Sequence, residues 1–167
     1  MKKLLVPFCL TLIIFIGSAG VGQSADFQKG WTAYQSGDYA TALREWKPLA
    51  EQGHGVASYG LGVMYRDGQG VSKNYKTAVK WFKLAAELQD ALGQHNLAVM
   101  YVNGQGVPQD YIRAYMWWEI AASSGIKSIA AGAVSARDSA SKRMAPAEIA
   151  EAKKLARECV RKKYKGC

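Results

Sequence analysis

Apolar residues recur every three or four positions through most of this chain, which is the spacing of one face of an α-helix. The pattern is clearest between residues 55 and 126, where a 36-residue sequence is written twice, as 55–90 and 91–126. Each copy contains two apolar stripes separated by a glycine-rich turn. A fixed period of this length is typical of a solenoid, in which pairs of helices stack on one another.

The two copies predict the same pair of helices at equivalent positions. The first helix carries Leu61 and Gly62 on its apolar face, and the glycine is expected where a neighbouring helix comes close. A Gly-Gln-Gly turn ends this helix in both copies, because glycine accepts the positive φ of a helix C-terminus. Asn74 and Asp110 then stand at equivalent positions and are good N-caps for the second helix.

The sequences before and after the two copies are also predicted to be helical. Residues 26–54 form a degenerate unit with a tighter turn, in which Asp38 lies 36 residues before Asn74. The period is lost after residue 126, and residues 127–167 are predicted to form a basic helical cap, which a solenoid needs because its last repeat has no neighbour. We therefore predict an all-α fold, a right-handed α-solenoid of three helix pairs with a C-terminal helical cap.

These residues resemble the Sel-1-like repeat family, a branch of the tetratricopeptide-like helical superfamily. The family pattern runs approximately A-x-x-x-L-G-x-x-Y, then G-x-G-V-x-x-D-Y, then A-x-x-W-x-x-x-A-A, and both copies carry it nearly in full. The second copy departs from it at Gly93 and Ala98, where the residues are still small. The resemblance covers residues 26–126 and implies a scaffold or adaptor that binds other proteins.

The concave face of such a solenoid, lined by the first helix of each unit, is the predicted binding surface for a protein or peptide partner. The candidate partner-binding residues lie outside the core pattern, at three positions of the first copy and the three matching positions of the second: Tyr59, Val63, Arg66, His95, Val99 and Val102.

Net charge is concentrated at one end of the chain. The formal charge is +9. Residues 26–126 hold 9 Lys+Arg and 9 Asp+Glu, whereas residues 127–167 hold 11 Lys+Arg and 4 Asp+Glu. The basic cap is therefore either a solvated face or a contact surface for an anionic partner such as the cell envelope. The first 25 residues predict export from the cytoplasm, which argues against nucleic acid as the partner.

Residues 1–25 are predicted to be a secretory signal peptide. Two lysines precede the apolar run Leu4–Ile16, and small residues follow it. As a helix this run would span only ~20 Å, which is short of the roughly 30 Å hydrocarbon core of a membrane. We expect cleavage between Gly20 and Ala25 and an exported protein, periplasmic or extracellular and of bacterial type. An uncleaved membrane anchor is the alternative.

A disulfide between Cys159 and Cys167 is also predicted. Cys9 would be lost with the signal peptide, and the remaining even pair in an exported protein is normally oxidised. Gly166 permits the chain to turn back toward the last helix. Two free thiols, or pairing between two molecules through Cys167, are the alternatives.

No residue pattern in the sequence indicates catalysis. His54 and His95 stand apart from any metal-binding or acidic cluster, and the Gly-Gln-Gly turns lack the lysine and the preceding strand of a phosphate loop. Trp117 and Trp118 occupy core positions of the repeat. We therefore predict no enzyme, no catalytic or metal-binding residue and no cofactor.

Two alternative functions remain. Cysteine-rich relatives of the family have been associated with penicillin binding and hydrolysis, which implies a β-lactam-binding or hydrolysing enzyme. Those relatives pair cysteines inside every repeat, and this chain has none there. The other alternative is a cell-envelope component held by its basic cap.

Overall fold

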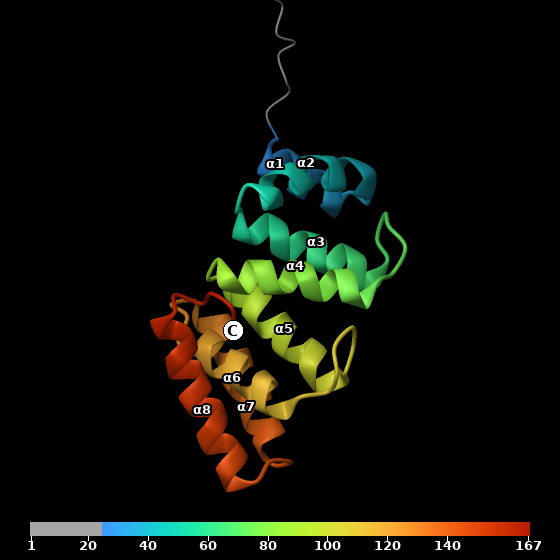
Figure 1. The fold of residues 1–167 in the computed structure, drawn as a ribbon. Helices are drawn as coiled ribbons and strands as arrows, with labels where there is room; N and C mark the ends of the chain where they lie inside the picture. Colours follow the sequence, from blue (N-terminus) through green and yellow to red (C-terminus); the bar gives the residue numbers. More distant parts are fainter. Residues whose placement is uncertain (1–24) are drawn as a thin grey trace, which may run out of the picture.

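The computed structural model describes residues 25–167, and this part of the chain contains eight α-helices and no β-strand (Figure 1). The predicted signal peptide lies outside the described residues, apart from Ala25. The helices are α1 (Phe27–Gln35), α2 (Tyr39–Glu51), α3 (Gly55–Asp67), α4 (Tyr75–Glu87), α5 (Ala91–Asn103), α6 (Tyr111–Ala122), α7 (Lys127–Ser141) and α8 (Pro146–Arg161). The predicted all-α solenoid is confirmed.

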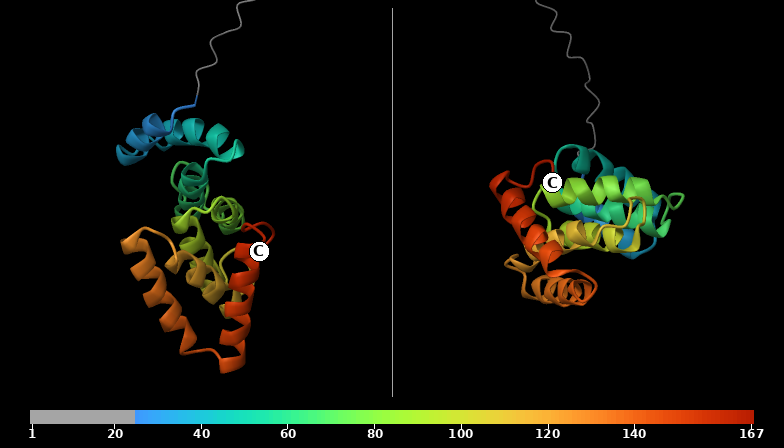
Figure 2. Two further views of the ribbon diagram at one scale, coloured as in Figure 1. Left: turned by 90° about the vertical axis from the view of Figure 1, so that its left-hand side faces the viewer. Right: turned by 60° about the horizontal axis from the view of Figure 1, so that its bottom comes forward.

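Six of these helices form three stacked pairs. Helix α1 packs on α2, α3 on α4 and α5 on α6, and each pair also packs on the next through α2–α3 and α4–α5 contacts. The cap is built differently, because α7 and α8 both pack on α6. Figure 2 shows these two helices spreading apart from the turn that joins them. No helix in the described range is long and apolar enough to cross a membrane.

The helix ends follow the local sequence. The side chains of Asn74 and Asp110 accept hydrogen bonds from the backbone N–H groups of Thr77 at 3.0 Å and Arg113 at 2.8 Å. These bonds satisfy donors that otherwise have no partner in the first turn of a helix. Gly68 and its repeat counterpart Gly104 end the first helices in the left-handed conformation, with φ of 75° and 63°.

Close helix packing depends on glycines that lie directly against side chains of the neighbouring helix. Gly62 of α3 lies against the ring of Phe82 in α4, and a Cβ atom added to it would lie 2.5 Å from Phe82 Cε1. Gly93 of α5 lies against Ala85 in the same way, with the added Cβ 2.5 Å from the Ala85 Cβ. Since real Cβ atoms do not approach other atoms so closely, these positions accept only glycine without rearrangement.

The chain ends in a short tail that folds back against the solenoid. The structure joins Cys159 of α8 to Cys167 in a disulfide, with a Cα–Cα distance of 5.6 Å. Gly166 has a φ of 68°, in the left-handed region that favours glycine. Its N–H donates a hydrogen bond to Glu87 Oε1 at 3.4 Å, so the tail also contacts α4.

Candidate binding groove

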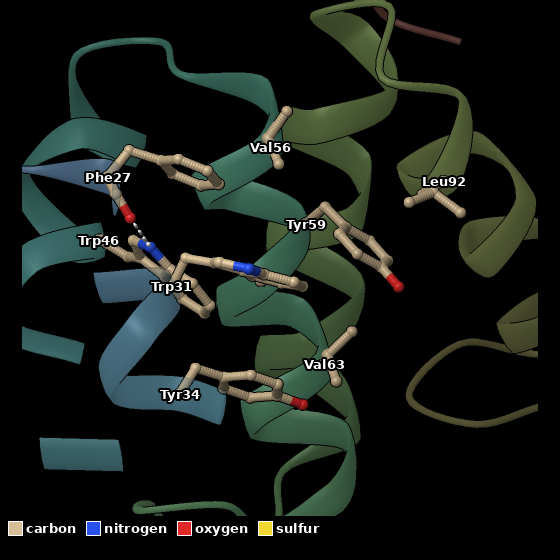
Figure 3. Close-up of a pocket in the computed structure, with 9 residues that line it drawn as sticks. Phe27, Trp31, Tyr34, Trp46, Val56, Tyr59, Val63 and Leu92 are labelled. Atoms are coloured by element: carbon tan, nitrogen blue, oxygen red, sulfur yellow. Dashed lines mark hydrogen bonds between the residues drawn. The ribbon is translucent and has the colours of Figure 1, made fainter. Parts of the chain in front are cut away.

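An apolar groove lies between the first helices of the solenoid. It encloses about 260 Å³ and is lined by residues of four helices, drawn in Figure 3: Phe27, Trp31, Tyr34, Trp46, Val56, Tyr59, Gly60, Val63 and Leu92. None of these side chains carries a charge. Trp31 and Val56 are 40% and 43% exposed, which is unusual for large apolar side chains and leaves an apolar surface open to a partner.

Trp46 forms the floor of the groove and explains why the groove exists at this place. Its side chain is 1% exposed and lies between Gly30 of α1 and Gly60 of α3. A Cβ added to either glycine would come within 2.5 or 2.6 Å of the indole. The indole N–H donates to the backbone oxygen of Phe27 at 3.3 Å. The large ring thus fills the space between α1 and α3 and keeps their backbones apart.

The two walls of the groove run in the same direction. The Phe27 ring stacks on His54, the residue that caps the N-terminus of α3, with ring centroids 4.9 Å apart. At the other end of α1, the Tyr34 hydroxyl donates to Gln69 Oε1, just after α3, at 2.8 Å. The groove therefore follows about two helical turns, or roughly 10 Å.

The wall formed by α1 is the repeat counterpart of the predicted binding stripe. Gly30 packs on Trp46 as Gly62 packs on Phe82, so residues of α1 match residues of α3 that lie 32 positions later. In this register Phe27, Trp31 and Tyr34 correspond to Tyr59, Val63 and Arg66.

This correspondence was missed at the level of sequence because the register changes within the first unit. The turn from 36 to 38 is four residues shorter than the later turn from 68 to 74, so the period is 32 before the turn and 36 after it. The signal available in the sequence was the aromatic spacing of four and then three residues in Phe27, Trp31 and Tyr34.

The six predicted partner-binding residues do not form one continuous surface. Tyr59 and Val63 line the groove, but Arg66 lies beyond it. The Arg66 guanidinium donates to Asn96 Oδ1 of α5 at 2.7 Å and pairs with Asp67 at 2.8 Å. Arg66 therefore ties α3 to α5 at the position where a partner was expected.

The three predicted residues of α5 are used mainly for packing. The ring centroids of His95 and Trp118 are 6.1 Å apart, and Val99 packs against the buried apolar core that residues of α3 to α8 form. Val102 lines a separate cavity of about 420 Å³ between α5, α6 and α7. The physical reason is that α5 packs directly on both α3 and α7, whereas the Trp46 ring lies between α1 and α3.

Burial sets the protonation of the polar groups near the groove. It raises the pKa of the hydroxyls of Tyr34 and Tyr59 above the usual value, so both remain protonated and able to donate hydrogen bonds at neutral pH. Burial lowers the pKa of His95, which favours the neutral imidazole. Within the described residues, no group of three His, Cys, Asp or Glu side chains is placed to hold a metal ion.

Comparison with known proteins places this architecture. The family model described as Sel1 repeat matches residues 55–90 and 91–126. A protective antigen present in uropathogenic Escherichia coli strains, with an SLR fold, is similar in structure (TM-score 0.73, 22% identity, 81% of this chain and 30% of that one). A Sel1 repeat protein from Oxalobacter formigenes is also similar (TM-score 0.60, 27% identity, 65% of this chain and 44% of that one).

The matched region is less than half the length of either solved protein. At 22% identity, the likeness to the antigen concerns the fold alone. No curated protein matches the sequence.

Proposed function

Since this chain belongs to the Sel1 repeat family, whose members generally mediate protein–protein interactions, we propose that it is an exported scaffold that binds a protein or peptide partner in the groove between α1 and α3. The observation that carries the proposal is the open apolar surface of Trp31 and Val56 above the buried Trp46. The few residues that carry most of the binding energy in a protein interface are enriched in Trp, Tyr and Arg.

The experiment compares capture of partners from periplasmic extract by the wild-type protein and three variants. Trp31→Ala and Val56→Ala remove groove surface. Ile126→Ala is a matched control, because Ile126 lies outside the groove, just before α7, and is 54% exposed. A partner captured by the wild type and by Ile126→Ala should be lost with Trp31→Ala and reduced with Val56→Ala.

For a purified partner, Trp31→Ala should raise the dissociation constant by about 30-fold, which corresponds to the loss of an interface hot spot of ~2 kcal/mol. Melting temperatures close to that of the wild type would show that the variants are folded. Equal binding by Trp31→Ala and wild type would exclude the groove as the site.

The proposed export is supported by the sequence before α1 and by a cysteine pair of the kind that persists in oxidising compartments. It is tested by mass spectrometry of the mature N-terminus, which should begin after a cleavage between Gly20 and Ala25. Peptides from Leu4–Ile16 in the mature protein would refute cleavage.

The Sel1 fold is typically a non-catalytic scaffold, and both described cysteines lie in the cap and not in the repeats. These observations favour the scaffold over the alternative of a β-lactam-hydrolysing enzyme. Turnover of a chromogenic β-lactam by the purified protein would reverse that preference.

We propose a second contact, between the basic cap and an anionic surface of the cell envelope. The observation that favours it is the excess of 11 Lys+Arg over 4 Asp+Glu in residues 127–167.

A further inference from the structure

Helix α8 has two chemically distinct faces. Ala152, Ala156 and Cys159 are buried on the side that packs toward α6. The outward side holds exposed residues: Lys153, Lys154, Arg157, Val160 and Arg161. At about 100° per residue these five positions fall within an arc of roughly 120°, so they form one continuous face along the helix.

Two of the four cations on this outward face form ion pairs, and both pairs are exposed. Lys154 pairs with Glu151 at 3.6 Å and Arg161 with Glu158 at 3.8 Å. The Lys154 and Arg161 side chains are 58% and 75% exposed, and such surface pairs are weak. Five further cations of the outward face and the tail form no ion pair with any other residue between 25 and 167: Lys153, Arg157, Lys162, Lys163 and Lys165.

The disulfide holds the charged tail close to the end of α8. Lys162, Lys163 and Lys165 all lie in the loop that the Cys159–Cys167 bond closes. The hydrogen bond from Gly166 to Glu87 fixes the same loop against α4. The cations of the tail are therefore held next to the C-terminal end of this outward face.

We propose that this surface, the outward face of α8 with the tail Lys162–Lys165, docks on the anionic phospholipid headgroups of a membrane. The inference rests on the envelope contact proposed above and names its chemistry. Clustered basic side chains are attracted to anionic lipid surfaces. Val160 is 45% exposed among the cations, and an apolar side chain at this place suits the boundary between headgroups and acyl chains better than a soluble acidic polymer.

This docking would leave the groove accessible. Helices α1 and α3 lie toward one end of the solenoid, and α8 runs along the other end (Figure 1, Figure 2). A molecule held by α8 would thus present the groove to a partner away from the lipid surface, and the repeats between them would act as a spacer.

The experiment measures sedimentation of the purified mature protein with vesicles of phosphatidylethanolamine containing 30% phosphatidylglycerol. We expect binding in 0.05 M salt and release in 1 M salt, where the Debye length falls to about 3 Å. A triple variant of the face, Lys153→Gln, Lys154→Gln and Arg157→Gln, should reduce the vesicle partition coefficient by on the order of a hundredfold, since each cation contributes about fivefold near an anionic surface.

A matched control removes three lysines from the exposed face of α4: Lys76→Gln, Lys80→Gln and Lys83→Gln. It changes the net charge equally and should retain most of the binding. Equal losses in the two triple variants would show attraction to net charge alone and overturn the assignment to α8.

A parallel measurement with soluble polyglutamate distinguishes binding to lipid headgroups from binding to an anionic polymer of the envelope. Binding to polyglutamate but not to vesicles would refute the lipid assignment and leave an acidic polymer as the envelope partner. Binding to neither would refute the envelope contact as well, whereas partner capture by the groove is measured independently.

Discussion

The packing of Gly62 against Phe82 makes a sharp prediction about stability. Replacing Gly62 with Ala places a Cβ atom 2.5 Å from Phe82 Cε1, and Phe82 is fully buried, so its ring cannot move into solvent. Overpacking of this kind costs roughly 1–3 kcal/mol. The same substitution stabilises the helix by about 0.5–1 kcal/mol, because alanine loses less backbone freedom on folding.

Gly132 in α7 is the matched control, because within the described structure no atom beyond the neighbouring backbone of its own helix lies within 4 Å of its Cβ position. Gly132→Ala should gain only the stabilisation that alanine gives to a helix. The difference in the free energy of unfolding between the two variants therefore measures the cost of overpacking at Gly62, ~1–3 kcal/mol. For a chain of this size the melting temperatures should differ by about 4–12 °C, with Gly132→Ala the higher. Equal melting temperatures, measured by circular dichroism, would refute the packing argument.

Two further predictions concern the cap and the first unit. The non-reduced protein should be lighter by two hydrogens than its reduced form. Cys167→Ser should lower the free energy of unfolding by ~2–3 kcal/mol. Two thiols open to alkylation without reductant would contradict the disulfide. A hydrogen bond from Lys29 at 2.8 Å is the main cause that lowers the pKa of Glu45 in the folded protein. The stabilisation that results is fully present above the pKa of Glu45 in the unfolded chain, about 4.3, and is lost as the pH falls through the lower pKa of the folded protein. Glu45→Gln should therefore flatten the fall in melting temperature between pH 5 and pH 3, and a fall as steep as that of a Glu51→Gln control would contradict the assignment.

The sequence by itself determined the helices and their ends. The 3–4 spacing of apolar residues, the caps at Asn74 and Asp110 and the turns ended by Gly68 and Gly104 all depend on interactions between residues a few positions apart. Because the two copies carry equivalent residues at these positions, the helices predicted for one copy are predicted at the matching positions of the other.

The approach of Cys167 to Cys159 was also accessible to sequence analysis, because only eight positions separate the two residues. A turn containing Gly166 is enough to bring them together.

The groove was decided by the tertiary structure. Its walls come from residues as far apart as Phe27 and Leu92, and its width is set by Trp46, whose place between two glycines depends on how α2 packs on both neighbours. The same packing closes the face between α3 and α5, where the smaller Phe82 replaces Trp46 and Arg66 bonds across to the next helix. A periodic sequence predicts equivalent positions, but the side chains packed between each pair of neighbouring helices determine which of those positions remain open.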